Sequence, residues 1–226
     1  ADNRAVTPPP PNDHLRRARH AVHAAFFVFG VLVATLGVHV PQIRAHYRLD
    51  DGGLSIALLA VAVGAVLCLA FAGRWIAAFG VRRVAAAAAC VMAVALALLL
   101  QFDRFALLLV VMLFFGASVG LFDVAINTEG TFIESALQRK VMSTMHGMWS
   151  LGGMAGAGLG AWSLAREVAP LVQMRIVAAG AAVVALLAVA CMLPAHAPAG
   201  EPGAAGARWS GLPREARRTL IALGVL

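Results

Sequence analysis

Charged residues are scarce in this sequence of 226 residues: Asp, Glu, Lys and Arg make up 13% of it, whereas 61% is hydrophobic. A soluble domain carries about 25% charged and about 50% apolar residues. The deficit argues against a soluble fold and predicts an all-α protein embedded in a lipid bilayer. The net charge of +7 lies in short basic segments between apolar runs, without the basic stripe interleaved with aromatic residues that marks a nucleic-acid site.

Signatures of catalysis and of metal binding are also missing. The three cysteines, Cys68, Cys90 and Cys191, lie within apolar runs and lack metal-ligand spacing, so they indicate neither a metal site nor a disulfide framework. No H-E-x-x-H motif occurs, and Ser150, in "MWSLGG", does not fit the G-x-S-G motif of a rhomboid-like protease. We therefore expect no cofactor, no metal and no enzymatic activity.

Long apolar runs dominate the sequence instead, and about 20 such residues suffice for a membrane helix. Six runs are long enough, which predicts a six-helix bundle. They cover residues 21–41, 53–78, 83–101, 105–128, 142–163 and 171–193.

Three further segments flank the predicted bundle. Residues 1–20 are rich in proline and then in basic residues, which is typical of a disordered cytoplasmic tail. An Arg cluster before an apolar run also opens signal peptides, but here the run is long and several more follow. Residues 194–218 predict a cytoplasmic interdomain linker, and residues 219–226 predict the start of a seventh membrane helix.

The basic residues predict the orientation, because cytoplasmic loops are enriched in Lys and Arg. With a cytoplasmic N-terminus, 5 of the 18 basic residues face outside and the other 13 (18 − 5) face the cytoplasm. The outside set is Arg44, Arg48, Arg104, Arg166 and Arg175. We therefore expect a multi-pass protein of a bacterial inner membrane with its N-terminus in the cytoplasm.

A weak internal repeat divides the six runs into two sets of three. "FGVLVATLGV" from Phe29 corresponds to "FGASVGLFDV" from Phe115 (115 − 29 = 86), and "AGRW" from Ala72 corresponds to "LGAW" from Leu159 (159 − 72 = 87). Ala-rich runs also match one another by chance. If the repeat is real, it predicts two inverted three-helix units, because the second unit enters the membrane from the opposite side.

Two polar residues stand four positions apart in the fourth run, within "GLFDVAINTEG". Asp123 and Asn127 share one helix face with Gly116 and Gly120. A charged side chain in the bilayer core costs at least about 2.5 kcal/mol. Asp123 must therefore face protein or a hydrated cavity, or be protonated, which favours a substrate-binding or proton-coupling role. The alternative is an ion pair or a helix cap near the cytoplasmic edge.

Two glutamates follow in the same segment. Glu129 lies off the face of Asp123, and Glu134 returns to it only if the helix runs unbroken past Gly130. We interpret both glutamates as solvated or paired residues at a helix end.

The fifth run, "MSTMHGMWSLGGMAGAGLGAW", combines polar residues with glycines that predict close helix packing. Histidine side chains ordinarily titrate near neutral pH, so His146 either takes part in binding and coupling or lies at a helix end. Trp149 either anchors the helix at the membrane interface or stacks on a ring-shaped solute. His23 and His39, near the ends of the first run, are interpreted as interfacial.

The segment "GRWIAAFGVRR", residues 73–83, resembles the signature loop of the major facilitator superfamily, G-x-x-x-D-R-x-G-R-R/K-R/K. The resemblance implies the N-terminal six-helix half of such a transporter, with this segment as a cytoplasmic gate loop. Alanines at positions 77 and 78 replace the acidic and basic residues of the signature, so the family's charge network is incomplete here. The matching positions are Gly73, Gly80, Arg82 and Arg83.

Within that superfamily, residues 21–193 resemble the fucose–proton symporters and their bacterial relatives. Helix 4 of that branch carries E-T-A-A-N, and "DVAIN" has the same spacing, which implies that Asp123 binds solute or proton. His146 and Trp149 take the positions of a glutamine and an asparagine that contact sugar. Gly37 takes the position of a second carboxylate, which is therefore missing.

These observations predict a secondary transporter that moves a small polar or sugar-like solute by alternating access, in symport with protons. A second six-helix half, from the same or another chain, would complete it. Proton-driven efflux of drugs or metabolites is the alternative, although the fifth run lacks the proline, and the fourth the basic residue, that are usual in drug antiporters. A non-transporting sensor or assembly module fits the buried acid less well.

Overall fold

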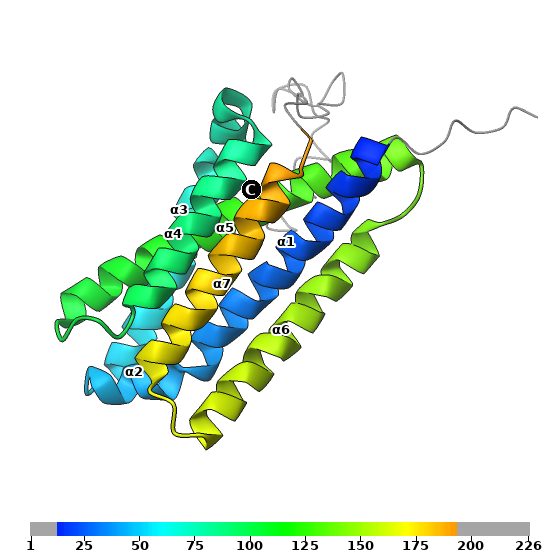
Figure 1. Cartoon of the computed structure of the whole chain (residues 1–226). Coiled ribbons are helices and arrows are strands. Elements are labelled where there is room, and N and C mark those ends of the chain that lie inside the picture. Colours follow the sequence, from blue (N-terminus) through cyan, green and yellow to red (C-terminus); the bar gives the residue numbers. More distant parts are fainter. Residues whose placement is uncertain (1–12, 194–226) are drawn as a thin grey trace, which may run out of the picture. The chain divides into compact units, whose positions relative to one another are not determined.

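The computed structural model describes residues 13–193, and every regular element in that part is a helix. Six long helices run alongside one another as a bundle, and the short α2 lies at one end of it (Figure 1). Their bounds are Asp13–Val38 (α1), Val40–His46 (α2), Asp51–Phe79 (α3), Val81–Leu98 (α4), Phe105–Leu137 (α5), Met142–Ala165 (α6) and Pro170–Ala190 (α7). Each of the six predicted runs therefore forms a helix.

The segments predicted at the two ends are described only in part. α1 already begins at Asp13, so residues 13–20 are helical and the prediction of a disordered tail is wrong for them. Residues 1–12, the predicted linker 194–218 and the predicted seventh helix 219–226 lie outside the described residues.

Among residues 13–193, five helices are long and apolar enough to cross a membrane: α1, α3, α4, α5 and α7. The remaining long helix, α6, has 24 residues and is also long enough. Its glycines and polar side chains lower its hydropathy, so composition alone supports five of the six predicted spans. α6 nevertheless lies along α1, its most extensive partner in the bundle (Figure 1).

The first predicted run is interrupted near its C-terminal end. α1 stops at Val38 and α2 follows, because Pro41 has no N–H with which to continue the helical hydrogen bonds. His39 lies at this break and is fully buried. Its Nε2 donates to Oε1 of Gln173 on α7 at 2.7 Å. His39 near the end of the first run is therefore a buried residue that is held by a partner on another helix.

The fourth run continues as one unbroken helix through Gly130, where α5 touches the start of α6. A Cβ at Gly130 would lie 2.8 Å from Sδ of Met142. One turn further on, the carboxylate of Glu134 accepts hydrogen bonds from the backbone N–H groups of Val141 at 2.7 Å and Met142 at 2.9 Å. Glu134 is therefore a paired residue that holds the N-terminus of α6.

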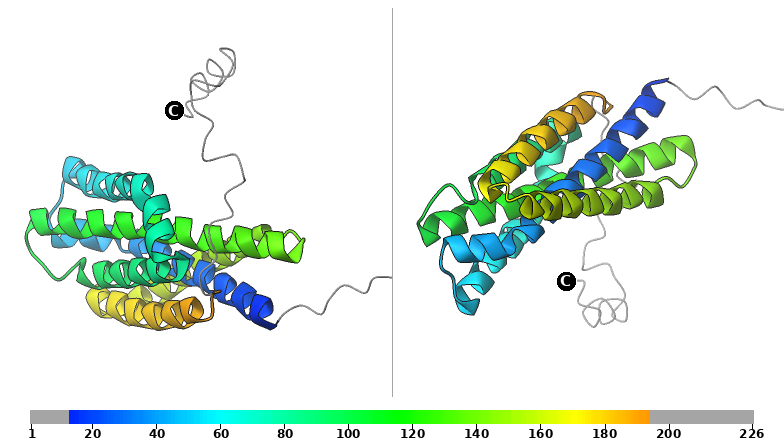
Figure 2. Two further views of the ribbon diagram at one scale, coloured as in Figure 1. Left: turned by 90° about the horizontal axis from the view of Figure 1, so that it is seen from above. Right: turned by 60° about the horizontal axis from the view of Figure 1, so that its bottom comes forward.

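Two pairs of helices in the bundle pack with their backbones close together (Figure 2). α1 packs along α6 and α3 along α5, and in each pair the two glycines nearest to the partner helix face one of its backbone carbonyls. A side chain at any of these glycines would overlap that carbonyl. The four contacts are Gly30 with Trp149, Gly152 with Phe27, Gly116 with Val61, and Gly64 with Leu113.

These contacts relate the two halves of the bundle. A shift of 86 residues carries α1 onto α5 (30 to 116 and 27 to 113), and a shift of 88 carries α3 onto α6 (61 to 149 and 64 to 152). Consecutive membrane helices alternate in direction, so the two units are inverted. The predicted pair of three-helix repeats is confirmed. For the second alignment the contacts give an offset of 88 residues, one more than the predicted 87.

Candidate functional site

The carboxylate and the amide predicted from the fourth run contact each other on α5. Nδ2 of Asn127 donates to Oδ1 of Asp123 at 2.9 Å and to the backbone oxygen of Asp123 at 2.9 Å. Both side chains are half-buried. The four-residue spacing places them on one helix face, as the sequence indicates.

Phenylalanines of α1 connect this pair to the predicted residues of α6. The ring of Phe26 lies 5.2 Å from that of His146, and the ring of Phe29 lies 6.5 Å from that of Trp149. Phe29 also meets Phe122 of α5 edge to face at 5.7 Å. α1 therefore carries an aromatic bridge between α5 and α6.

We call Asp123, Asn127, His146 and Trp149 the polar face. His146 is near enough to Asp123 for the two side chains to interact electrostatically. His146 and Trp149 are exposed on the bundle, with 41% of Trp149 accessible. The structure thus places His146 near the bonded pair of Asp123 and Asn127, and the ring of Phe29 links Trp149 to Phe122, the neighbour of Asp123.

This face offers hydrogen bonding, one acidic group and aromatic surface. A carboxylate, an amide and an imidazole can hold a polar molecule, and the carboxylate and imidazole can each carry a proton. Indole and phenyl rings can cover the apolar side of such a molecule. In the described part of the chain, no three His, Cys, Asp or Glu residues cluster closely enough to hold a metal ion.

The sequence alone did not identify the three phenylalanines as residues of this site. Phe26 and Phe29 are three residues apart and share a helix face, and Phe122 precedes Asp123 directly. Both spacings were available as signals, but phenylalanine is common on membrane helices. Only the contact between α1 and the two other helices selects these rings from the rest.

The predicted gate loop is mostly helical: residues 73–79 end α3, residues 81–83 begin α4, and Gly80 alone connects the two helices. Gly80 has φ of 80° and ψ of 152°, a conformation that is almost confined to glycine. Gly73 is exposed and has no atom within 4 Å of the position its Cβ would take. Arg83 is exposed as well. Of the two glycines in this motif, Gly80 is therefore the one that the backbone requires.

Arg82 connects this loop to the ends of two other helices. Its Nη2 donates to the backbone oxygen of Ala190 at the end of α7 at 2.9 Å, and the guanidinium interacts electrostatically with Glu129 of α5. Glu129 is fully buried, and its Oε1 accepts the backbone N–H of Leu193 at 2.9 Å. Of the two alternatives predicted for Glu129, solvated or paired, the structure has the paired one, and the carboxylate is buried rather than exposed.

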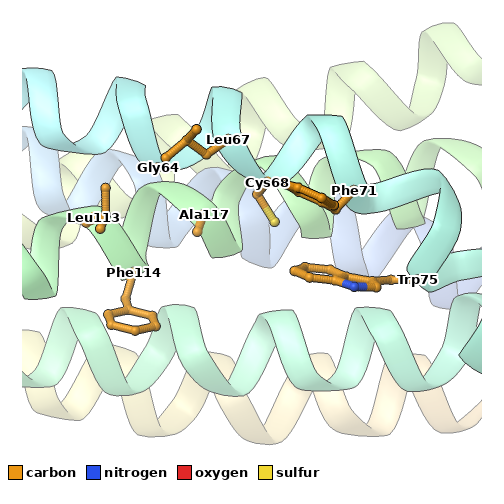
Figure 3. Close-up of a pocket in the computed structure, with 8 residues that line it drawn as sticks. All are labelled: Gly64, Leu67, Cys68, Phe71, Trp75, Leu113, Phe114 and Ala117. Carbon is orange, nitrogen blue, oxygen red and sulfur yellow. The ribbon is translucent and has the colours of Figure 1, made fainter.

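Two apolar grooves lie on the surface of α3, α4 and α5, away from the polar face. One, of about 300 Å³, is lined by α3 and α5 residues that include Gly64, Phe71, Trp75 and Phe114 (Figure 3). The other, of about 460 Å³, lies between α4 and α5 and includes Phe114 as well. Their linings are almost wholly apolar, so they lack the hydrogen-bonding groups that would orient a polar solute.

The sequence matches the profile of the Major Facilitator Superfamily over residues 22–225. It is 36% identical over 134 residues to an uncharacterized MFS-type transporter of Yersinia pestis, covering 59% of this chain and 35% of that protein. It is 32% identical over 136 residues to the uncharacterized transporter y4wD of Sinorhizobium fredii, covering 60% and 36% of the two chains. It is 31% identical over 136 residues to the membrane protein MosC of Rhizobium meliloti, covering 60% and 33%.

Each match therefore spans about a third of the relative's length. Among solved structures, the nucleoside transporter NupG superposes with a TM-score of 0.63 at 17% identity, over 94% of this chain and 53% of NupG. At that identity the likeness concerns the fold alone. The bundle thus has the architecture of one half of such a transporter.

Proposed function

Because the chain belongs to the major facilitator superfamily, we propose that it supplies the N-terminal half of a secondary active transporter for a small polar or sugar-like solute. The polar face carries the proposal: a carboxylate bonded to an amide, near a histidine on a neighbouring helix that also carries an exposed tryptophan. Alternating access against a second six-helix half would expose this face to each side of the membrane in turn. The membrane would be a bacterial inner membrane, with the N-terminus in the cytoplasm.

Asp123 is the residue to which we assign proton coupling. A charged carboxylate among apolar helices is costly, and no ion pair reaches Asp123 within residues 13–193. Taking up a proton neutralises the carboxylate and removes that cost. Binding of the solute and binding of the proton can therefore be linked. The resemblance to the fucose–proton symporter branch supports the same role for this position.

Uptake into proteoliposomes tests the proposal. The complete reading frame that encodes this chain is reconstituted, a pH gradient is imposed with the outside acidic, and accumulation of labelled polyols and sugars is measured. We expect accumulation above the external concentration, and we expect Asp123→Asn to abolish it while binding of the solute persists. Asp103→Asn makes the same chemical change at a side chain that is 96% exposed in a loop, and should leave accumulation unchanged.

The result decides between the proposed directions of transport. Accumulation that survives in Asp123→Asn refutes the coupling role. Movement of solute out of vesicles against its gradient, driven by protons moving in, would replace symport with efflux of drugs or metabolites.

A further inference from the structure

The two apolar grooves on α3, α4 and α5 meet at Phe114, which lines both of them. The first follows α3 to Trp75, 5 residues before the turn at Gly80 (80 − 75), and the second follows α4 to Leu98, 18 residues after it (98 − 80). At about 1.5 Å per residue, the joined groove extends over about 20 Å along the helices. Each leaflet contributes half of a hydrocarbon core of about 30 Å, so this length accommodates one acyl chain.

The lining of the joined groove is apolar and uneven. Gly64 and Ala117 contribute little side-chain bulk, whereas the rings of Phe71 and Phe114 project beside them (Figure 3). α3 packs along α5 but hardly against α4, which leaves part of α5 accessible between them, and Phe114 on that part is 57% exposed. A recessed apolar surface gives a hydrocarbon chain more close contacts than a smooth helix face does.

A basic residue stands at the end of the groove near the turn between α3 and α4. The guanidinium of Arg74 lies 5.6 Å from the centre of the Phe71 ring, and that ring stacks with Trp75 at 6.1 Å. Both rings line the groove (Figure 3). Arg74 is exposed, and within residues 13–193 no carboxylate lies close enough to form an ion pair with it. Its charge is therefore available to an anion from outside the bundle.

We infer that the joined groove binds one acyl chain of an anionic phospholipid, with the phosphate of that lipid on Arg74. Guanidinium and phosphate groups form charge-assisted hydrogen bonds, often through two parallel N–H groups. Tryptophan is enriched where headgroups meet hydrocarbon, and Trp75 follows Arg74 directly, so the headgroup and the start of the chain meet the residues that suit each. In the proposed orientation this is the cytoplasmic leaflet. The lipid covers the part of α5 that α3 and α4 leave open, away from the polar face.

Fluorescence quenching of Trp75 by brominated lipid tests the inference without any solute. In the complete reading frame, every tryptophan except Trp75 is replaced by phenylalanine, and a second variant keeps only Trp162. Each protein is reconstituted in phosphatidylcholine that contains a small, equal fraction of chain-brominated phosphatidylglycerol or chain-brominated phosphatidylcholine. Salt at about 1 M limits the attraction between exposed charges to about 3 Å. We expect phosphatidylglycerol to quench Trp75 with an apparent affinity about tenfold above that of phosphatidylcholine.

Trp162 supplies a matched control on another helix. Arg166 lies 5.7 Å from its ring, which is the same kind of contact, but Trp162 lines neither of the two grooves. The two brominated lipids should therefore quench Trp162 about equally. Arg74→Gln should abolish the preference at Trp75, and Arg166→Gln should leave it unchanged. Equal preference at the two tryptophans, or a preference that survives in Arg74→Gln, overturns the inference and leaves the transporter proposal untouched.

Mass spectrometry of the intact protein in detergent measures the stoichiometry. Phosphatidylglycerol and phosphatidylcholine are added in equal amounts to the unaltered protein and to Arg74→Gln. The unaltered protein should retain one more molecule of phosphatidylglycerol than the variant does, and the same number of phosphatidylcholine molecules. Identical lipid counts in the two proteins would show that Arg74 holds no anionic lipid.

Discussion

The contact between α1 and α6 allows one sharp prediction from two neighbouring glycines. An alanine at Gly152 would place its Cβ against the carbonyl group of Phe27, 2.8 Å from the carbonyl carbon, where ordinary contacts are at least 3.4 Å. The obstacle is helix backbone, which cannot rotate away as a side chain can. An alanine at Gly153 would meet nothing within 4 Å. Gly153→Ala is therefore a matched control for Gly152→Ala.

The magnitude follows from comparing the two variants. Both gain the same helix propensity, about 1 kcal/mol for alanine over glycine, so this contribution cancels in the difference. Overpacking costs about 1–3 kcal/mol, and a rigid backbone partner places Gly152 at the upper end of that range. We expect Gly152→Ala to unfold more easily than Gly153→Ala by about 3 kcal/mol, which is about a hundredfold in the unfolding equilibrium constant.

Reversible unfolding in mixed micelles, followed by tryptophan fluorescence while the fraction of denaturing detergent rises, measures the difference. Gly153→Ala should be at least as stable as the wild type. Equal stability of the two variants would mean that α1 and α6 do not approach at Gly152, and the inverted-repeat packing would have to be abandoned.

Two further predictions concern the turn at Gly80 and the buried bond at the break after α1. Gly80→Ala should lower the free energy of unfolding by about 1–3 kcal/mol because of its backbone conformation. Gly73→Ala, in open space near the end of α3, should not, and equal losses in this unfolding assay would contradict the strain argument. His39→Leu should cost about 1–3 kcal/mol by leaving the side chain of Gln173 without its partner. The double variant with Gln173→Leu should lose less than the sum of the two single variants, and strict additivity would show that the bond contributes nothing.

The fold was largely predictable because the bilayer imposes a length and an apolar composition on every crossing segment. The runs that became α3, α4 and α7 were placed to within a few residues. α6 shows where composition fails: its Gly, Ser and His residues dilute the hydropathy that identifies the other spans. Those same glycines let it approach α1, so the feature that weakens the signal is the one that holds the helix in the bundle.

The candidate site was predictable only within single helices. Asp123 and Asn127 share a face by their spacing, and a lone carboxylate in an apolar run is costly enough to attract notice. His146 and Trp149 lie on another helix, and no periodicity states how two helices are placed beside each other. Their approach to Asp123 depends on Phe26 and Phe29 of a third helix, α1.

The sequence by itself determined which segments form long apolar helices and which of them carries the acidic group, because burial in lipid and helical periodicity act on residues close together in the chain. The two related units were only suggested by a weak repeat, which the glycine contacts between helices then supported. Only the tertiary structure decided that His39 and Glu129 are buried with partners, and that the polar face spans α5 and α6. In the same way, His39 meets Gln173 and Glu129 accepts the backbone N–H of Leu193. Those properties depend on which atom of one helix meets which atom of another, and that is fixed by the packing of glycines and aromatic rings across the bundle.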